Sequence, residues 1–302
     1  MIKILITSVG SLVGQNILDS LETRRSQLEV IGLNSVAANQ RVFRCDRAYL
    51  VPPVEEVGEF TPRFLSIIRE ESPHLILAGR DADVVFLAKF KENFPEYFQT
   101  IPCGSSEMSE MMWDKYESFL FAQRHQIPFA ESFLYRNLDD REALVSFVQK
   151  QGFPLVAKPR KGFASKGVFY ITNNDQIEVW VRQNTEILFQ EFLGDLEQVE
   201  KHKHLTQLGL PHFFQIPESN HTSAQNIFSP DGKLLGSLVT NHIMIGGKAE
   251  SLELFTDSTA ESFVNLCAEK YGKLGWTGVL NFQFKKDIHG NWKIFELNPR
   301  IL

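Results

Sequence analysis

The sequence predicts a protein of mixed α/β and α+β class, with an N-terminal Rossmann-like unit followed by a two-lobed α+β unit. Strands and helices alternate over the first hundred residues, whereas strands outnumber helices after Phe133 and pair with their sequence neighbours. A length of 302 residues suffices for two or three packed units.

The first 105 residues have the pattern of a parallel sheet with helical crossovers. We predict strands at 2–6, 28–33, 48–51 and 74–78, and a short strand that ends at Pro102. Helices are predicted from Gly14 to about Arg24, over 60–70 and over 83–90. We expect this unit to end near Ser105.

The rest of the chain changes from alternating elements to hairpins. Helices are predicted over 109–125, 140–151, from about 172 to Arg182, and over 258–274 with Ser258 as N-cap. Strands are predicted at 155–158, 168–171 and 187–192. Hairpin turns are predicted at 229–232 and 288–291. The charged segment 194–220 has no readable pattern.

Composition excludes several classes of protein. The net charge is −6 and the three cysteines are far apart, which argues against nucleic acid as a partner and for reduced thiols. No apolar run approaches the ~18 residues of a membrane span, and the first residues read as a strand instead of a signal peptide. We therefore expect a soluble cytoplasmic protein that binds neither nucleic acid nor membrane.

The second hairpin predicts which of its side chains face one another. A four-residue loop at 288–291 places Asp287 opposite Trp292, and the same register places Gln283 opposite Glu296. Opposed Cβ atoms lie about 4.5–5.5 Å apart. We expect Gln283 and Glu296 to lie together on one sheet face.

Oxygen-bearing side chains gather on that face. Asn298 shares it with Glu296, because side chains alternate along a strand with period two. One carboxylate and two carboxamides suit Mg²⁺, which takes oxygen ligands and keeps waters or phosphates. Arg300 stands beside them as a candidate anion clamp. The alternative is an exposed polar face on an edge hairpin.

An apolar strand ends at Lys158 and leads into a basic, glycine-containing loop. Such a strand end presents one ammonium group, and the loop with Gly162, Lys166 and Gly167 suits a cover over phosphates. The loop is not a P-loop, because Val168 stands where the obligatory lysine would be. The alternative is a solvated turn.

Two weaker signals accompany these. Residues 188–194 form an apolar strand that runs into an acidic, glycine-ended corner, where backbone groups could pair an adenine edge. Lys115 lies where one helix gives way to another. A plain strand end and a surface lysine are the alternatives.

A dinucleotide-binding unit is the third hypothesis for the N-terminal region. Gly10 and Gly14 follow a strand, but the G-x-G-x-x-G spacing is missing, and the second strand leads to Asn34 instead of an acidic residue. The sequence thus argues against an NAD-dependent oxidoreductase.

Taken in order, these segments resemble the ATP-grasp superfamily, closest in style to the large subunit of carbamoyl phosphate synthetase and its small stand-alone relatives. The resemblance covers most of the chain. Its most specific motif is Gln283 followed by Glu296-Leu297-Asn298-Pro299-Arg300. It implies a pre-ATP-grasp domain over 1–105, an N-terminal ATP-grasp lobe over 106–189 and a C-terminal lobe over 190–302.

The resemblance also implies a role for each motif residue. Residues on phosphates, adenine and ribose would be Lys115, Lys158, Lys166 in a lid, Gln190, Glu191, Phe192, Leu193 and Glu197. The ligands of Mg²⁺ or Mn²⁺ would be Gln283, Glu296 and Asn298. The catalytic residues, on the transferring phosphoryl group, would be Arg300 and Lys158.

The activity implied is ATP- and Mg²⁺-dependent ligation of a small-molecule carboxylate to an amine through an acyl phosphate, with release of ADP and phosphate. Two segments, 220–222 and 241–244, depart from the residues that many relatives use for the acceptor. The chain also ends at Leu302, directly after the motif, where relatives continue. We therefore expect nucleotide binding, with a catalytically weak ATP-binding or regulatory module as the alternative to a ligase.

Overall fold

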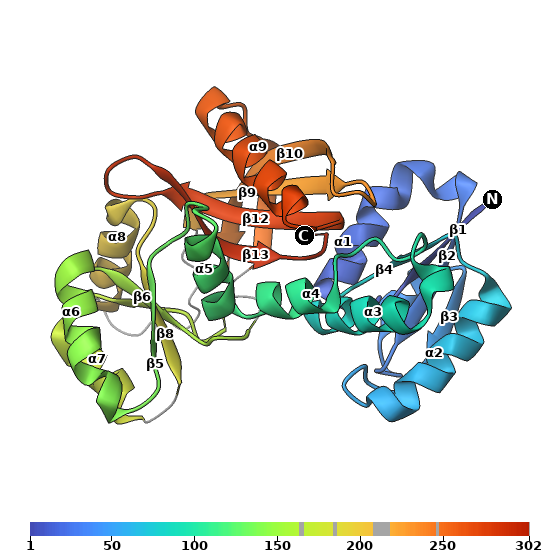
Figure 1. Cartoon of the computed structure of the whole chain (residues 1–302), viewed down its shortest axis with the longest axis horizontal. Coiled ribbons are helices and arrows are strands. Elements are labelled where there is room, and N and C mark those ends of the chain that lie inside the picture. The colour runs from blue at the N-terminus through green and yellow to red at the C-terminus, as the bar shows by residue number, and fades with distance from the viewer. Residues whose placement is uncertain (163–165, 184–185, 208–217, 246–247, 302) are drawn as a thin grey trace.

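The computed structural model describes residues 1–162, 166–183, 186–207, 218–245 and 248–301. The described strands form three sheets, which lie side by side along the molecule in Figure 1. No helix in these ranges is long and apolar enough to cross a membrane.

The N-terminal sheet is parallel, as the alternating pattern predicted, and its strand order is β3-β2-β1-β4. Its elements are β1 (Ile2–Ile6), α1 (Leu12–Leu21), β2 (Leu28–Asn34), β3 (Arg47–Leu50), α2 (Val57–Glu71), β4 (Leu75–Leu77) and α3 (Asp81–Asn93), with short 3₁₀ helices at 22–27, 40–44 and 95–97. The predicted strand ending at Pro102 is wrong. Ile76 N donates to Thr100 O at 2.8 Å, but Pro102 has no N–H with which to continue a ladder.

The second sheet is antiparallel, with the order β5-β8-β6-β7. Its strands are β5 (Ser132–Tyr135), β6 (Leu155–Lys158), β7 (Phe169–Ile171) and β8 (Ile187–Glu191), and its helices are α6 (Arg141–Gln151) and α7 (Asn174–Arg182). The sequence pattern did not predict the four-residue strand β5. The predicted helix over 109–125 is two helices, α4 (Ser106–Trp113) and α5 (Lys115–Arg124). They separate at Asp114, whose carboxylate accepts from Tyr116 N and Glu117 N and caps α5.

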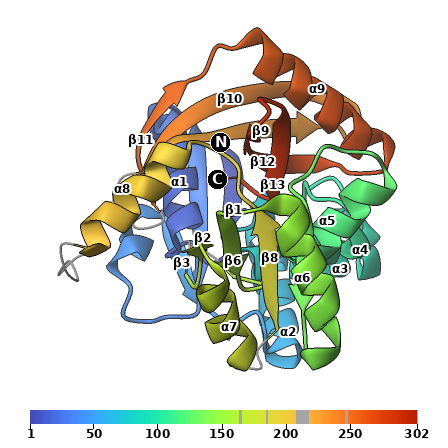
Figure 2. The same ribbon diagram turned by 90° about the vertical axis from the view of Figure 1, so that its left-hand side faces the viewer.

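The third sheet is antiparallel, with the order β11-β10-β9-β12-β13. Its strands are β9 (Glu218–Phe228), β10 (Leu234–Ile245), β11 (Lys248–Leu254), β12 (Gly278–Lys286) and β13 (Trp292–Asn298). Helix α9 (Ser258–Lys273) packs on one face, on the side away from the other two sheets (Figure 2). The opposite face carries the polar strand residues that concern the site. The N-cap of α9 is Asp257, not Ser258, because the Asp257 carboxylate accepts from two backbone N–H groups.

The hairpin turn predicted at 229–232 is confirmed by the bond from Gly232 N to Ser229 O, at 2.9 Å. Strand β11 was not predicted. The segment 194–220 contains α8 (Leu196–Gln207) and the start of β9, and its residues 208–217 lie outside the described ranges.

The second hairpin has the predicted pairing of Gln283 with Glu296, but its turn differs from the predicted one. Trp292 faces Lys286, not Asp287, whose carboxylate instead accepts from backbone N–H groups inside the turn. The register then shifts by one residue at Phe295, and this bulge restores the predicted pairing of Gln283 with Glu296.

Gly278, the first residue of β12, has φ +78°, and a Cβ there would lie 2.0 Å from the carbonyl oxygen of Pro102. We expect Gly278→Ala to lower the free energy of unfolding by about 2–4 kcal/mol, because the alanine adds both backbone strain and a clash. Urea unfolding checks this. Gly236→Ala in β10, where a Cβ meets nothing within 4 Å, is the matched control. Equal stability of the two variants would contradict the prediction.

Candidate functional site

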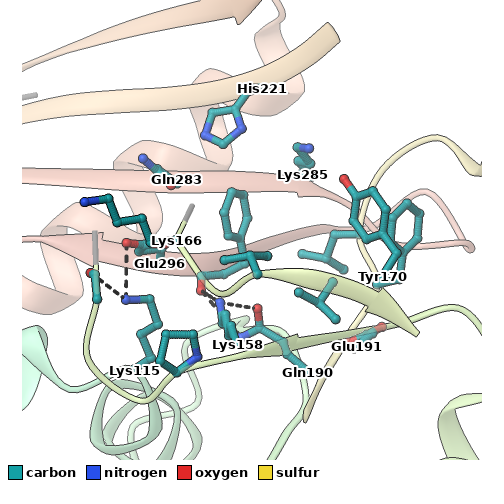
Figure 3. Close-up of a pocket in the computed structure, with 17 residues that line it drawn as sticks. Lys115, Lys158, Lys166, Tyr170, Gln190, Glu191, His221, Gln283, Lys285 and Glu296 are labelled. Atoms are coloured by element: carbon teal, nitrogen blue, oxygen red, sulfur yellow. Dashed lines mark hydrogen bonds and ion pairs between the residues drawn. The ribbon is translucent and has the colours of Figure 1, made fainter. Parts of the chain in front are cut away.

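A pocket lies between the second and third sheets, and side chains from both point into it (Figure 3). Strands β6 and β8 supply one wall, and β9, β12 and β13 supply the other. The polar side chains that line the pocket are Lys115, Lys158, Lys166, Tyr170, Gln190, Glu191, His221, Gln283, Lys285 and Glu296.

Lys158 connects the two walls. Its side chain is buried, and Nζ donates to Gln190 Oε1 at 2.7 Å and to the Phe295 carbonyl oxygen at 3.2 Å. Burial lowers the pKa of Lys158 to about 7, a shift that the Glu296 carboxylate opposes and the Lys115 ammonium reinforces. The amine therefore changes charge near neutral pH.

Lys115 and Glu296 face each other across the pocket. Lys115 is the first residue of α5, and its Nζ lies 3.6 Å from Glu296 Oε1 and donates to the Gly162 carbonyl oxygen at 3.2 Å. Burial opposes ionisation of Glu296, but the positive charges of Lys115, Lys158 and Arg300 hold its pKa below the ordinary value. Glu296 is thus a carboxylate at neutral pH.

The pocket has more cationic than anionic side chains. Four lysines line it against two carboxylates, those of Glu191 and Glu296. Glu191 is paired outside this set, since Lys293 Nζ lies 2.7 and 2.9 Å from its two oxygens. An excess of ammonium groups in a recess favours a polyanionic ligand, such as a chain of phosphates.

The face of β12 and β13 offers oxygen donors. Gln283 pairs with Glu296 and Asn281 pairs with Asn298, and strand alternation puts all four side chains on one face. Asn281 Oδ1 is buried without a hydrogen-bond partner. Within the described ranges, no three His, Cys, Asp or Glu side chains form a cluster that could hold a metal. The donor set, with one carboxylate and several amide oxygens, therefore fits a hard cation such as Mg²⁺ and not Zn²⁺.

The corner at the end of β8 combines polar and apolar groups. Gln190 is buried and its Nε2 donates to Ser132 Oγ at 3.0 Å. Phe192 and Leu193 are buried beyond it, and the Phe192 ring meets the edge of Tyr170 with centroids 5.6 Å apart. A flat heterocycle would find aromatic and aliphatic contacts here.

Three residues that the resemblance assigned to the site do not line this pocket: Glu197, Asn298 and Arg300. Glu197 is exposed on the first turn of α8. Arg300 Nε and Nη2 donate to the Asp81 carboxylate at 2.8 and 3.2 Å, and Nη2 also donates to Asn298 Oδ1 at 3.1 Å. Lys166 does line the pocket, whereas residues 163–165 of the predicted lid lie outside the described ranges.

The sequence reasoning missed several polar residues of this region, among them Asn281, Lys285 and His221. Asn281 and Lys285 lie two residues on either side of Gln283 on β12, so period-two counting along that strand could have found them. No residue identified on β9 offered a starting point for finding His221 in the same way.

A second imidazole lies next to His221 on β10. His242 Nε2 is 2.8 Å from Ser223 Oγ and 2.9 Å from Thr240 Oγ1. Burial, reinforced by His221, lowers the pKa of His242 to about 4. His242 is therefore neutral at physiological pH.

Sequence comparison matches the chain to no protein-family model and to no curated protein. Solved structures match it over almost its whole length at low identity. N5-carboxyaminoimidazole ribonucleotide synthetase from Thermotoga maritima has a TM-score of 0.63 and 18% identity, over 99% of this chain and 69% of that one. L-amino acid ligase from Bacillus licheniformis has a TM-score of 0.66 and 16% identity, over 100% of this chain and 67% of the ligase. Biotin carboxylase from Campylobacter jejuni has a TM-score of 0.69 and 14% identity, over 100% of this chain and 66% of the carboxylase.

These structures share one architecture, a parallel N-terminal sheet followed by two antiparallel sheets. The chain therefore has the ATP-grasp fold, as the order of its motifs predicted. It spans about two thirds of the length of the proteins that it matches.

The buried amine of Lys158 makes stability depend on pH. Because its pKa in the folded chain is about 7 and its ordinary value is 10.5, the unfolded chain holds more protons between these values, and stability rises with pH over that window. Replacing the amine by Lys158→Met removes this dependence. We expect the unfolding free energy of the wild type, relative to the variant, to increase by about 2 kcal/mol from pH 6 to pH 9. Denaturant unfolding at both pH values measures it, and a constant difference would contradict the prediction.

Proposed function

We propose that the chain is an ATP- and Mg²⁺-dependent ligase that joins a small-molecule carboxylate to an amine or similar nucleophile, in the manner of the carbamoyl phosphate synthetase large subunit. The observation that carries the proposal is the pocket in which Lys115 and Lys158 face the Gln283–Glu296 pair. In this pocket ammonium groups suited to phosphates lie across from oxygen donors suited to a cation.

The nucleotide would lie between the two sheets. Its phosphates would contact Lys115, Lys158 and Lys166, and its base would occupy the corner at 190–193 beside Tyr170. Three solved structures of the same fold support nucleotide binding, though not its position, by what they contain: a purK protein with ADP, a biotin carboxylase domain with MgADP, and the biotin carboxylase from Campylobacter jejuni as a beta-gamma-ATP complex.

Gln283, Glu296 and Asn298 would hold Mg²⁺, with Asn281 as a further oxygen donor on the same face. Bound there, the ion would neutralise phosphate charge and orient the phosphoryl group. The partnerless oxygen of Asn281 and the ionised state of Glu296 support this assignment.

The residues of the chain would act by position and charge. Phosphoryl transfer requires charge stabilisation more than covalent help from the protein. The substrate carboxylate would attack the terminal phosphorus of ATP, the bond to ADP would break, and an acyl phosphate would result. The amine would then displace phosphate and lose a proton. Lys115, Lys158 and Arg300 would stabilise the charge on the transferring group.

One observation favours the second candidate, an ATP-binding module without ligase activity. Ser223, Thr240 and His242 stand on the face next to the proposed metal site, and they bond to one another at 2.8 to 3.1 Å. These mutual bonds leave less capacity for an acceptor substrate. The two candidates differ in outcome, because only the ligase releases ADP when a carboxylate and an amine are supplied.

A thermal-shift titration tests nucleotide binding directly. ATP with Mg²⁺, at about 100 times its Kd, should add about 2.7 kcal/mol, which raises Tm by a few degrees for a chain of this size. NADH is the control and should give no shift. An equal response to NADH and to ATP with Mg²⁺, or no response to ATP, would contradict the proposal.

Glu296→Gln tests the cation site. The variant keeps the shape of the side chain but removes the charge, so we expect the Mg²⁺-dependent part of nucleotide affinity to fall by about tenfold or more. Isothermal titration with and without Mg²⁺ measures it. Glu253→Gln, on the exposed edge strand β11 of the same sheet, is the matched control and should retain wild-type affinity. Full Mg²⁺ dependence in Glu296→Gln would contradict the assignment.

A further inference from the structure

An ion pair joins the N-terminal sheet unit to the end of β13. Asp81 is the first residue of α3, and Arg300 follows β13 by two residues. Two parallel hydrogen bonds, at 2.8 and 3.2 Å, connect the guanidinium to both carboxylate oxygens. Both side chains are largely buried, with 16% and 10% of their surfaces exposed. Such a bidentate pair, largely shielded from water, is stronger than an exposed surface salt bridge.

The guanidinium is nearly saturated by acceptors of the chain. Arginine has five N–H groups, and four hydrogen bonds leave Arg300: two to Asp81, one to Asn298 Oδ1 and one from Nη1 to the Ile301 carbonyl oxygen. One N–H of Nη1 therefore has no acceptor among the described residues. The four bonds fix the plane of the group and with it the direction of this remaining donor.

We propose that Asp81 is a positioning residue of the phosphoryl-transfer site, which orients Arg300 beside Asn298 so that its remaining N–H group meets a terminal phosphate. The inference rests on the proposed function, since it requires Arg300 to act on that phosphate. It gives the N-terminal sheet unit an indirect part, through Arg300, in the reaction at the third sheet.

The charges around Arg300 explain why a carboxylate is needed at position 81. Glu296 lies two residues before Asn298 on the same strand face, and Arg300 is among the groups that hold its pKa below the ordinary value. Without a negative charge on Asp81, the guanidinium would be drawn toward Glu296. It would then neutralise the carboxylate that the proposed cation needs.

A purely structural role for the pair predicts something different. Asp81 and Arg300 also help to attach α3 to the end of β13, where Pro299 and Ile301 line a small cavity together with Val84 and Leu87. Loss of that attachment would lower stability, but it would not distinguish nucleotides that differ only in the terminal phosphate.

The test compares two nucleotides on the full chain. Kd values for ADP and for the non-hydrolysable analogue AMP-PNP, both with Mg²⁺, are measured by calorimetry for wild type, Asp81→Asn, Asp81→Glu and Arg300→Gln, and for the double variant of Asp81→Asn with Arg300→Gln. Glu110→Gln is the control, because it breaks the exposed ion pair of Lys89, also on α3, without touching Arg300.

We expect Asp81→Asn to weaken AMP-PNP about tenfold and ADP less than about twofold, as loss of one charge-assisted contact to the terminal phosphate would. Asp81→Glu should recover most of the loss, and the double variant should be no weaker than Arg300→Gln alone. Glu110→Gln should match the wild type.

Other results would overturn the inference in distinguishable ways. Equal losses for ADP and AMP-PNP, or additive losses in the double variant, would show that Asp81 acts only on stability, while the proposed function would stand. Wild-type chain that binds neither nucleotide would overturn the proposed function and the inference together.

Discussion

The arrangement of the site depends on the two hydrogen bonds that the buried amine of Lys158 donates. The amine bonds to Gln190 on β8 and to the Phe295 carbonyl on β13, so a single group connects the second and third sheets. A buried ammonium without acceptors is costly, and separating the sheets would remove one of them. The same burial lowers the pKa of Lys158 to about 7. Phosphates entering the pocket would favour the charged form again, which couples ligand binding to the contact between sheets.

The acceptor on β13 is available because the strand is irregular. A bulge leaves its extra residue outside the regular ladder, and the extra residue here is Phe295, whose carbonyl faces Lys158. The bulge also shifts the register so that Glu296 faces Gln283. One inserted residue therefore sets both the contact between sheets and the pair of oxygen donors. If the strands paired regularly through this point, Phe295 would face Gln283, and Glu296 would face Phe282 on the side that packs against α9.

Much of this arrangement could be predicted from the sequence, because it depends on local patterns. Alternating elements predicted the parallel sheet, and the order of motifs predicted the ATP-grasp fold. The pairing of Gln283 with Glu296 was predicted with a wrong turn, since Lys286 and not Asp287 faces Trp292. The bulge that compensates depends on tertiary contacts. The Asp81–Arg300 pair joins residues 219 positions apart, and no local pattern indicates it.

A crystal structure of the chain with AMP-PNP and Mn²⁺ tests the central claim most directly, because the anomalous signal of manganese locates the ion independently of the nucleotide. The account predicts an anomalous peak at about 2.1–2.2 Å from oxygens of Glu296 and Gln283. It also predicts phosphates in contact with Lys115 and Lys158 and the base beside residues 190–193. Nucleotide bound elsewhere, or a manganese peak away from Glu296, would contradict it.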